Sequence, residues 1–256
     1  MYGIINLSVV PVRSEPSDRS EMLTQLLFGE HFLITASEGS WKKIKVAFDG
    51  YEGWIDEKQF ISITENEFQL LRNPYSTLSL DLVQVAVHQE QFNTLLLGST
   101  LPFYDGKTCR VGTLEFSFSG HSRNLEAKPT KSTLIENAYM YLNAPYLWGG
   151  RSPFGIDCSG FTQMVYKLNG IPIPRDASQQ AQVGTLVNFL DEATPGDLAF
   201  FENAEGNIVH VGIILANSMI IHASGKVRID KLDHYGIYHS ELKKYTHTLR
   251  VIKKFV

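Results

Sequence analysis

The sequence predicts a multidomain α+β protein, with two small β-rich modules first and a domain of helices and strands after them. Short strand-like runs between turn residues fill the first part of the chain, whereas helical apolar spacing begins after about residue 125. The 256 residues are 43% hydrophobic and 20% charged, which is ordinary for a soluble globular protein. This length suffices for more than one domain with its own core.

The two predicted β modules cover residues 1–65 and 66–124. In the first, "INLSVVPVRS" and "EMLTQLLFGEHFLITASEGSWKKIKVAFDGYEGWIDEKQF" alternate apolar and polar residues between Gly, Asp and Ser, a pattern typical of a small antiparallel barrel. The second contains "DLVQVAVHQ", "TLLLGSTLPFYDG" and "CRVGTLEFSFSG". Because "LLFGEHFLI" and "LLLGSTLPFY" both place an apolar–Gly pair before a strand, we expect a duplicated module.

The third predicted domain covers residues 125–256 and opens with two helices. "KPTKSTLIENAYMYLNAPY" starts with capping residue types, and its helical apolar spacing falls at Leu134, Ile135, Ala138, Tyr139 and Leu142. The second helix is expected from Cys158 to Gly170, with an apolar stripe made of Phe161, Met164, Val165 and Leu168. The runs "GDLAFFE", "NIVHVGIIL" and "MIIHAS" then predict an antiparallel meander.

Charge and hydropathy argue against two classes of partner. Lys and Arg total 23 and Asp and Glu total 27, a net charge of −4, so we expect no nucleic-acid partner. No apolar run approaches the roughly 18 residues that span a bilayer, so no membrane segment is expected. The N-terminus lacks a basic start before an apolar stretch, which predicts a cytoplasmic protein if Met1 is the native start. A secreted chain trimmed of its signal would show the same pattern.

Only two cysteines occur, Cys109 and Cys158, and their spacing makes no disulfide framework and no CxxC. Cys109 lies in the strand-like "GKTCRVGTLEF" and is expected to be a small core residue. Cys158 lies in "WGGRSPFGIDCSGF", at the first turn of the predicted helix, where unsatisfied N–H groups and the helix dipole favour a thiolate. The surrounding glycines either admit a substrate backbone or permit tight turns; they are Gly149, Gly150, Gly155 and Gly160.

Two histidines offer a base for this cysteine. His210 and His222 each interrupt an apolar strand, and their midpoint, Ala216, lies in the predicted turn "ANS". In a hairpin folded there, the two imidazoles would sit opposite each other on one face, with Cβ atoms about 5 Å apart. One histidine can then take the proton from Cys158 while the other orients it, as nucleophilic catalysis requires.

A zinc site is the alternative reading of the same three residues. One thiolate and two imidazoles could hold zinc with an open fourth position. Neither a second cysteine nor a carboxylate lies at the usual ligand spacing, and no HExxH motif occurs, so no metal is predicted.

Six segments resemble the NlpC/P60 family of papain-like cell-wall peptidases. They are "PYLWGG", "DCSGF", "PRDASQQ", "PGDLAFF", "VHVGIIL" and "IIHAS", in the family's order over about the last 130 residues. The β-rich first part resembles the bacterial SH3-like modules attached to such enzymes. The layout is most similar to γ-D-glutamyl-L-diamino acid endopeptidases, which trim murein peptides. The resemblance therefore implies SH3-like barrels before a papain-like α+β domain.

The resemblance also implies roles for individual residues. Cys158 would be the nucleophile, His210 the base, His222 the orienting residue and Tyr146 a contributor to the oxyanion site. Substrate contacts would come from Asp157, Ser159, Arg175 and Asp176, although some relatives have Ser where this chain has Ala177 after "PRD". Plainer roles stay open: Tyr146 could pack its ring, Asp157 and Ser159 could cap the helix, and Arg175 and Asp176 could form a surface ion pair.

In the similar endopeptidases, the first SH3-like module closes one end of the active-site cleft and binds the amine of an N-terminal L-Ala. The resemblance places the acidic residue of this gate at Glu30 and the aromatic residue at Tyr51. The alternatives are an exposed turn residue for Glu30 and barrel packing for Tyr51. A carboxylate gate would favour peptides with a free N-terminus over acetylated ones.

The sequence thus predicts a cysteine peptidase for the γ-D-glutamyl–diamino acid bond of murein peptides, acting in cell-wall recycling. No cofactor is implied, and no protein partner is predicted. The competing hypotheses are an amidase, transpeptidase or acyl transferase with the same nucleophile, or a wall-binding protein without catalysis. An intact set of one cysteine and two histidines argues against the wall-binding protein.

Overall fold

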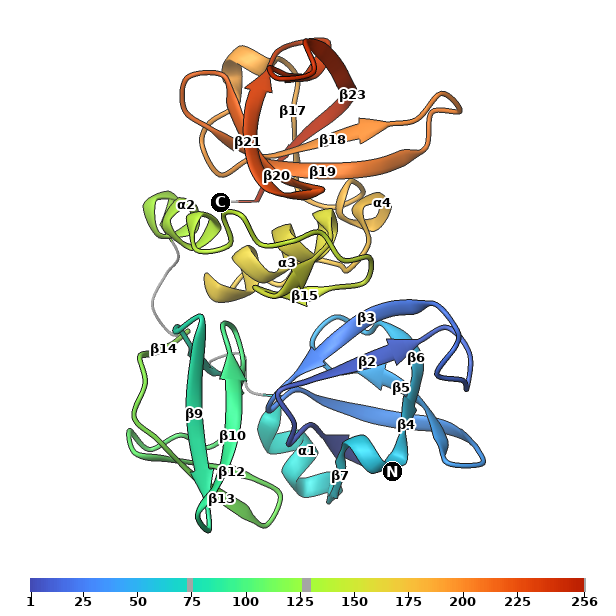
Figure 1. Cartoon of the computed structure of the whole chain (residues 1–256), viewed down its shortest axis with the longest axis vertical. Coiled ribbons are helices and arrows are strands. Elements are labelled where there is room, and N and C mark those ends of the chain that lie inside the picture. Colours follow the sequence, from blue (N-terminus) through green and yellow to red (C-terminus); the bar gives the residue numbers. More distant parts are fainter. Residues whose placement is uncertain (73–75, 126–129, 256) are drawn as a thin grey trace. The chain divides into compact units, whose positions relative to one another are not determined.

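The computed structural model describes residues 1–72, 76–125 and 130–255 (Figure 1). The chain forms two compact units. The first comprises Met1–Lys128 together with Arg151–Pro153, and the second comprises Pro129–Gly150 together with Phe154–Val256. The sequence predicted a boundary near residue 125, and the linker residues 126–129 lie outside the described residues.

Residues 1–72 form the predicted first barrel. Its antiparallel sheet has the strand order β3-β2-β6-β5-β4-β1-β7. The strands are β1 (Tyr2–Ile4), β2 (Val9–Arg13), β3 (Met22–Leu27), β4 (His31–Glu38), β5 (Trp41–Val46), β6 (Glu52–Asp56) and β7 (Ile61–Ile63). Alternate strand residues point inward, as period-2 patterning requires, and form a core that includes Val10, Val12, Phe32, Ile44 and Ile55. A 3₁₀ turn (Glu57–Gln59) and helix α1 (Glu65–Leu71) complete this part.

Residues 76–125 form the second β module, which has two small antiparallel sheets. Their strand orders are β10-β9-β13-β12 and β11-β8-β14. The strands are β8 (Thr77–Ser79), β9 (Val83–His88), β10 (Gln91–Leu96), β11 (Thr100–Leu101), β12 (Thr108–Val111), β13 (Leu114–Phe118) and β14 (Ser122–Asn124). Cys109 is buried in its core, as expected, beside Ile4 and Phe28 from the first barrel. Because the two modules share this core, they form one compact unit.

The two β modules repeat one turn, at the positions that suggested a duplication. Gly29 and Gly98 both have positive φ, +77° and +82°. The backbone N–H two residues before each glycine donates to the side chain after it, from Leu27 to Glu30 Oε2 (2.9 Å) and from Leu96 to Ser99 Oγ (3.1 Å). This match supports the predicted duplication and shows that Glu30 closes a turn inside the barrel.

Within residues 130–255, three helices pack against one antiparallel sheet. Helices α2 (Lys131–Tyr139) and α3 (Cys158–Leu168) pack together, and α3 and α4 (Ala177–Gln180) lie against β19 and its neighbours (Figure 1). The sheet order is β17-β23-β18-β19-β20-β21-β22, and β22 also pairs with β23, which closes β18 to β23 into a barrel. The strands are β17 (Thr185–Val187), β18 (Leu198–Glu202), β19 (Ile208–Leu215), β20 (Met219–Ser224), β21 (Lys226–Leu232), β22 (Gly236–His239) and β23 (Lys244–Lys254).

Three smaller elements lie between these helices and strands along the chain. They are β15 (Arg151–Ser152), β16 (Gly155–Ile156) and a 3₁₀ turn (Leu190–Glu192). Of these, β15 and β16 form a two-stranded sheet. This short hairpin separates "WGG" from "DCSG", and its residues Arg151–Pro153 belong to the first compact unit.

The two predicted helices form, with two differences from the sequence-based expectation. Helix α2 ends at Tyr139, so Leu134 and Ala138 are buried whereas Tyr139 and Leu142 are exposed. Helix α3 is buried on all sides rather than on one stripe. Polar side chains of this helix have buried partners: Thr162 Oγ1 donates to Gln180 Oε1 over 2.8 Å, and Gln163 Nε2 donates to the Ile173 carbonyl over 3.2 Å. A helix buried along its whole length needs such partners, because unpaired buried polar groups are costly.

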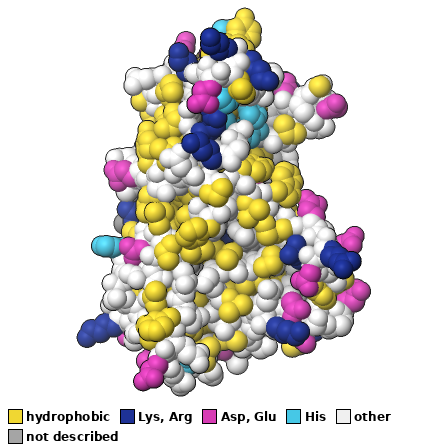
Figure 2. Space-filling model, viewed as in Figure 1, with side chains coloured by type: hydrophobic (Ala, Val, Ile, Leu, Met, Phe, Trp, Pro, Cys, Tyr) yellow, Lys and Arg dark blue, Asp and Glu magenta, His cyan; other side chains and the backbone are white. Residues whose placement is uncertain are grey.

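The surface agrees with the charge balance of the sequence. On the face shown in Figure 2, basic side chains gather at the top of the view among a few acidic and histidine side chains, and both signs of charge are mixed at its lower right. Among the described residues, no helix is both long enough and apolar enough to cross a membrane.

Candidate active site

Asp157 determines where helix α3 begins. Its backbone is extended (φ −92°, ψ 177°), and its Oδ1 accepts a hydrogen bond from the Gly160 N–H over 2.6 Å. Its Oδ2 accepts from the Gly149 N–H over 2.8 Å. This is N-capping, and it makes Cys158 the first residue of the helix, as predicted.

The glycines around Cys158 let the chain pack tightly against itself. A Cβ on Gly160 would lie 2.3 Å from the Gly150 carbonyl oxygen, and one on Gly150 would lie 2.3 Å from the Gly155 carbonyl oxygen. Gly149 has a positive φ of +76°. Of the two roles considered for these glycines, the structure therefore supports close packing and tight turns around the helix start.

Cys158 is a buried thiol at rest. Burial raises its pKa to about 12, with the charge of Asp157 adding to the increase, while the backbone of Val211, the charge of Arg175 and the backbone of Ser159 lower it. The helix start therefore does not by itself produce the expected thiolate, because desolvation outweighs the backbone groups and the Arg175 charge that lower this pKa. The contact with Val211 places the sulfur against β19, next to His210.

His210 and His222 meet on one face of the β19–β20 hairpin, but in a different register from the one predicted. His222 pairs with Gly212, so His210 is its diagonal neighbour rather than its direct partner. The turn is centred one residue later than Ala216, and Asn217 and Ser218 both have positive φ. A Cβ on Gly212 would lie 2.8 Å from His222 Cβ, so the glycine makes room for the imidazole.

The two imidazoles are nevertheless in direct contact. His210 Nε2 and His222 Nδ1 lie 2.8 Å apart, and the rings are nearly perpendicular. Burial lowers the pKa of both groups, that of His210 well below its usual value. Both are neutral at neutral pH, so His210 can accept a proton.

Asp230 and Arg228 extend this pair, and the sequence analysis missed both. His222 Nε2 lies 3.0 Å from Asp230 Oδ2, and Arg228 donates to both oxygens of Asp230 over 2.6 and 3.0 Å. Burial would raise the pKa of Asp230, but the hydrogen bonds from His222 and Arg228 outweigh it and lower this pKa to about 2. The only sequence signal was alternation in "KVRIDKL", which puts Arg228 and Asp230 on one face of β21.

His247 is a third histidine that sequence reasoning missed. Nitrogen atoms of His210, His222 and His247 all lie within 4.8 Å of one another. However, the rings of His210 and His247 are stacked, 4.1 Å apart and 25° from parallel. Lone pairs lie in the ring planes, so two stacked rings cannot direct them at one ion. The arrangement suits a hydrogen bond between His210 and His222 better than zinc binding.

Tyr146 lies beside the thiol. Its segment bridges to Ile156, and its N–H donates to the Gly225 carbonyl over 3.0 Å. Burial, together with the charges of Cys158 and Asp157, raises its pKa to about 12, while the charge of Arg175 lowers it. The hydroxyl therefore stays protonated near the sulfur and can donate a hydrogen bond to a developing oxyanion.

Asp157, Ser159 and Arg175 form one buried network. Arg175 donates to Asp157 Oδ2 over 2.6 Å and to Ser159 Oγ over 2.9 Å. The interpretation of Arg175 and Asp176 as a surface ion pair is wrong, because Arg175 is only 2% exposed and pairs with Asp157. Asp176 instead caps α4, and Ala177 is its first residue.

Glu30 and Tyr51 belong to the first unit. Glu30 is 3% exposed, and Arg151 of the same unit donates to its two carboxylate oxygens over 2.9 and 3.0 Å. The alternative of an exposed turn residue for Glu30 is therefore wrong, whereas its role in binding an N-terminal amine stays a prediction. Tyr51 packs against the barrel core, in line with its plainer role.

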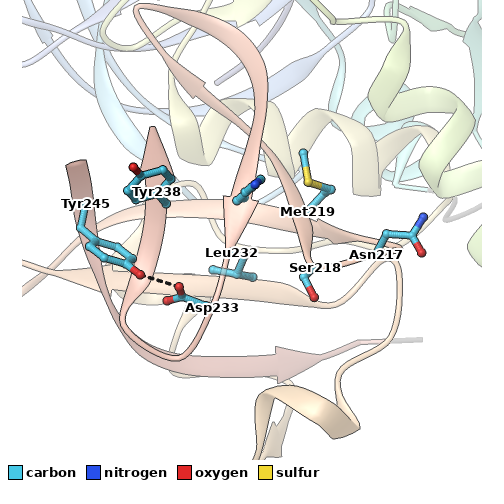
Figure 3. Close-up of a pocket in the computed structure, with 8 residues that line it drawn as sticks. Asn217, Ser218, Met219, Leu232, Asp233, Tyr238 and Tyr245 are labelled. Carbon is cyan, nitrogen blue, oxygen red and sulfur yellow. Dashed lines mark hydrogen bonds between the residues drawn. The ribbon is translucent and has the colours of Figure 1, made fainter. Parts of the chain in front are cut away.

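A pocket of about 460 Å³ lies at the β19–β20 turn and contains none of the predicted site residues (Figure 3). It is lined by Asn217, Ser218, Met219, Lys231, Leu232, Asp233, Tyr238 and Tyr245. Tyr245 donates its hydroxyl to Asp233 Oδ2 over 2.6 Å across the pocket. Cys158 instead contacts the backbone of Val211 in the middle of β19, and neither Cys158, His210 nor His222 lines this pocket.

Comparisons with known proteins agree with this geometry. The NlpC/P60 family model matches residues 143–248, and the bacterial dipeptidyl-peptidase Sh3 domain model matches residues 12–60. The γ-D-glutamyl-L-lysine dipeptidyl-peptidase of Bacillus subtilis (strain 168) is 32% identical over 212 residues, covering 78% of this chain and 71% of that protein. Dipeptidyl-peptidase 6 of Lysinibacillus sphaericus is 28% identical over 268 residues, covering 94% and 96%.

A solved structure has the same fold. The crystal structure of an NlpC/P60 family protein from Bacillus cereus ATCC 10987 matches with a TM-score of 0.83 and 22% identity, covering 99% of each chain. The expected SH3-like and NlpC/P60 folds are thereby confirmed.

Proposed function

Since the chain belongs to the NlpC/P60 family of cysteine peptidases, which fits its cysteine–histidine site, we propose that it cleaves γ-D-glutamyl–diamino acid bonds of murein peptides. The observation that carries the proposal is the placement of Cys158 at the start of α3, against the strand of a histidine pair. The names of the relatives support the choice of bond, because two of them are γ-D-glutamyl-L-lysine dipeptidyl-peptidases.

The resting site contains a neutral thiol and a neutral imidazole, so the proton moves as the substrate reacts. His210 takes the proton of Cys158 while the sulfur attacks the γ-carbonyl carbon of D-Glu. The carbonyl oxygen becomes an oxyanion, to which Tyr146 donates its hydroxyl hydrogen bond. The C–N bond then breaks, and His210 returns the proton to the leaving amine of the diamino acid.

Water completes the cycle. His210 takes a proton from a water molecule, whose oxygen attacks the thioester carbonyl. The carboxylic acid leaves, and the sulfur regains its proton from the imidazolium. His222 keeps the ring of His210 oriented through both halves of the reaction.

We further propose that the substrate has a free N-terminal L-Ala and that the enzyme acts in recycling of wall peptides in the cytoplasm. Release of a dipeptide, as the relatives' names describe, requires recognition of the substrate N-terminus. Asp157, Ser159, Arg175 and Asp176 remain the proposed substrate contacts near the nucleophile, with Glu30 and Tyr51 for the N-terminal amine. Because Glu30 already binds Arg151, an ammonium group would have to join that ion pair.

The test uses defined peptides and mass spectrometry. L-Ala-γ-D-Glu-L-Lys and its diaminopimelate analogue should release L-Ala-D-Glu, while N-acetylated versions should react slowly and Cys158→Ala should be inactive. Equal rates on free and acetylated peptides would remove the N-terminal gate and the recycling role. Cleavage only at the L-Ala–D-Glu bond, or transfer to an added amine, would favour an amidase or an acyl transferase. Binding without products would favour a wall-binding protein.

A further inference from the structure

We propose that Asp230 is a positioning residue of the peptidase site, which sets the protonation pattern of both histidines through a chain of hydrogen bonds. The proposal rests on the proposed roles of Cys158 and His210 but not on the identity of the substrate. Asp230 binds His222 rather than the thiol, and it acts through His222.

The chain of contacts leaves one consistent assignment of protons. An ionised carboxylate only accepts hydrogen bonds, so His222 carries its proton on Nε2 and donates it to Asp230 over 3.0 Å. His222 Nδ1 then has a lone pair and accepts from His210 Nε2 over 2.8 Å. His210 therefore carries its proton on Nε2, and its Nδ1 lone pair is available to take the proton of Cys158.

The sheet register builds this chain. Arg228 is paired directly with His222, and Asp230, two residues further along β21, is paired with Ile220. The guanidinium of Arg228 binds both oxygens of Asp230 and directs one of them at His222. His222 and Asp230 are 1% and 4% exposed, so water does not replace either partner easily.

Charge makes the same residue useful during the reaction. His210 becomes positive when it takes the proton, in a site whose burial strongly disfavours a cation. The carboxylate, connected through His222, stabilises that charge without receiving a proton, as the aspartate of a serine protease does. In a serine protease, replacing this aspartate by asparagine leaves the histidine in the wrong tautomer and lowers kcat by about 10⁴.

Other groups around His222 also affect its titration. Arg228 on β21 and His239 on β22 act on it directly. His247 on β23 faces His222 and Asp230, and Glu241 acts on Arg228. The experiment therefore compares variants at fixed pH as well as across a pH range.

The test measures the alkylation rate of Cys158 by iodoacetamide, followed by peptide mapping, which needs no substrate. Asp230→Asn should slow labelling at pH 7 by about 10- to 100-fold, the effect typical of outer partners of a reactive group. Asp230→Glu should recover part of the rate. The matched control is Asp233→Asn, which makes the same chemical change three residues away, at a residue bonded to the Tyr245 hydroxyl.

Side-chain ¹⁵N NMR of labelled histidines separates positioning from simple structural support. In the wild type, His222 and His210 should both be protonated on Nε2, and Asp230→Asn should shift that pattern toward Nδ1. If Asp230→Asn does not fold, Arg228→Gln is the second variant. It keeps the carboxylate but removes hydrogen bonds that lower the pKa of Asp230. As the pH is lowered, the labelling rate of this variant should therefore begin to fall at a higher pH than that of the wild type.

An unchanged labelling rate and tautomer in folded Asp230→Asn, or equal slowing in Asp233→Asn, would overturn the proposal. If Asp230→Asn slows labelling as predicted but the wild-type protein cleaves no murein peptide, the proposed substrate is contradicted and the role of Asp230 stands.

Discussion

The buried pair between Arg175 and Asp157 should be the most sensitive point of the helix start. Arg175→Met removes the guanidinium and keeps much of the side-chain volume. Asp157 would remain buried with two backbone N–H donors, from Gly149 and Gly160, and a longer hydrogen bond of 3.4 Å from Ser159 Oγ. Removing one partner of a buried ion pair costs about 3–5 kcal/mol, and the remaining donors place this case near 3 kcal/mol.

A loss of about 3 kcal/mol corresponds to a decrease in Tm of about 10 °C for a unit of this size. Differential scanning calorimetry is the suitable assay, because the two compact units can unfold in separate transitions. Only the transition of the second unit should move. The double variant Arg175→Met with Asp157→Asn should recover part of the loss, since an uncharged cap no longer needs the guanidinium.

Asp176→Asn is the control. If Arg175 and Asp176 formed a surface ion pair, Asp176→Asn and Arg175→Met would destabilise the unit equally. We expect it to change the free energy of unfolding by no more than about 0.5 kcal/mol. Equal destabilisation by Arg175→Met and Asp176→Asn, or a cost below about 1 kcal/mol for Arg175→Met, would refute the assignment of the ion pair.

Four further predictions concern the site and the two units. Cys158→Ala or Cys158→Ser should reduce kcat by about 10⁴ or more, with His210→Ala nearly as severe and His222→Gln milder; a near-normal rate in Cys158→Ser would contradict the nucleophile. Burial raises the pKa of both Cys109 and Cys158 to about 12, so only the base beside Cys158 should make it alkylate faster, and peptide mapping that finds equal labelling would refute this. Glu30→Ala should destabilise the first unit by about 3 kcal/mol, because Arg151 stays buried, and should also shrink the preference for free over acetylated peptides if the gate exists. Burial lowers the pKa of His247 from 6.5 to about 4, so between these pH values the unfolded chain binds more protons than the folded one. The second unit should therefore lose stability as the pH falls from 6.5 to 4, and this loss should be smaller in His247→Gln. A Tm that does not depend on pH, or an equal loss in His247→Gln, would contradict this.

Much of the catalytic set could be predicted from the sequence, because it depends on local patterns. Asp157 and Gly160 are three residues apart, so the start of α3 follows from capping within one turn. The meander likewise follows from closely spaced strands and short turns. Cys158, His210 and His222 stood out because each places a reactive side chain in a segment that is otherwise apolar or glycine-rich.

Pairings between distant residues could not be predicted in the same way. The hairpin register depended on a turn shifted by one residue, which made His210 and His222 diagonal rather than opposed. Asp230 and His247 come to the site on strands whose neighbours are known only after the sheet closes. Glu30 and Arg151 are 121 positions apart, and neither sequence segment indicates the other.

The sequence by itself therefore determined the elements, the nucleophile and its two histidines, because backbone propensity, capping and periodicity act over a few residues. Only the tertiary structure decided which charges are buried and paired, and hence that Arg175 supports Asp157, that Glu30 binds Arg151 and that Asp230 reaches His222. Burial is a property of the whole packed unit. Since it raises the pKa of the Cys158 thiol and lowers that of His210, it also decides that the resting site is neutral.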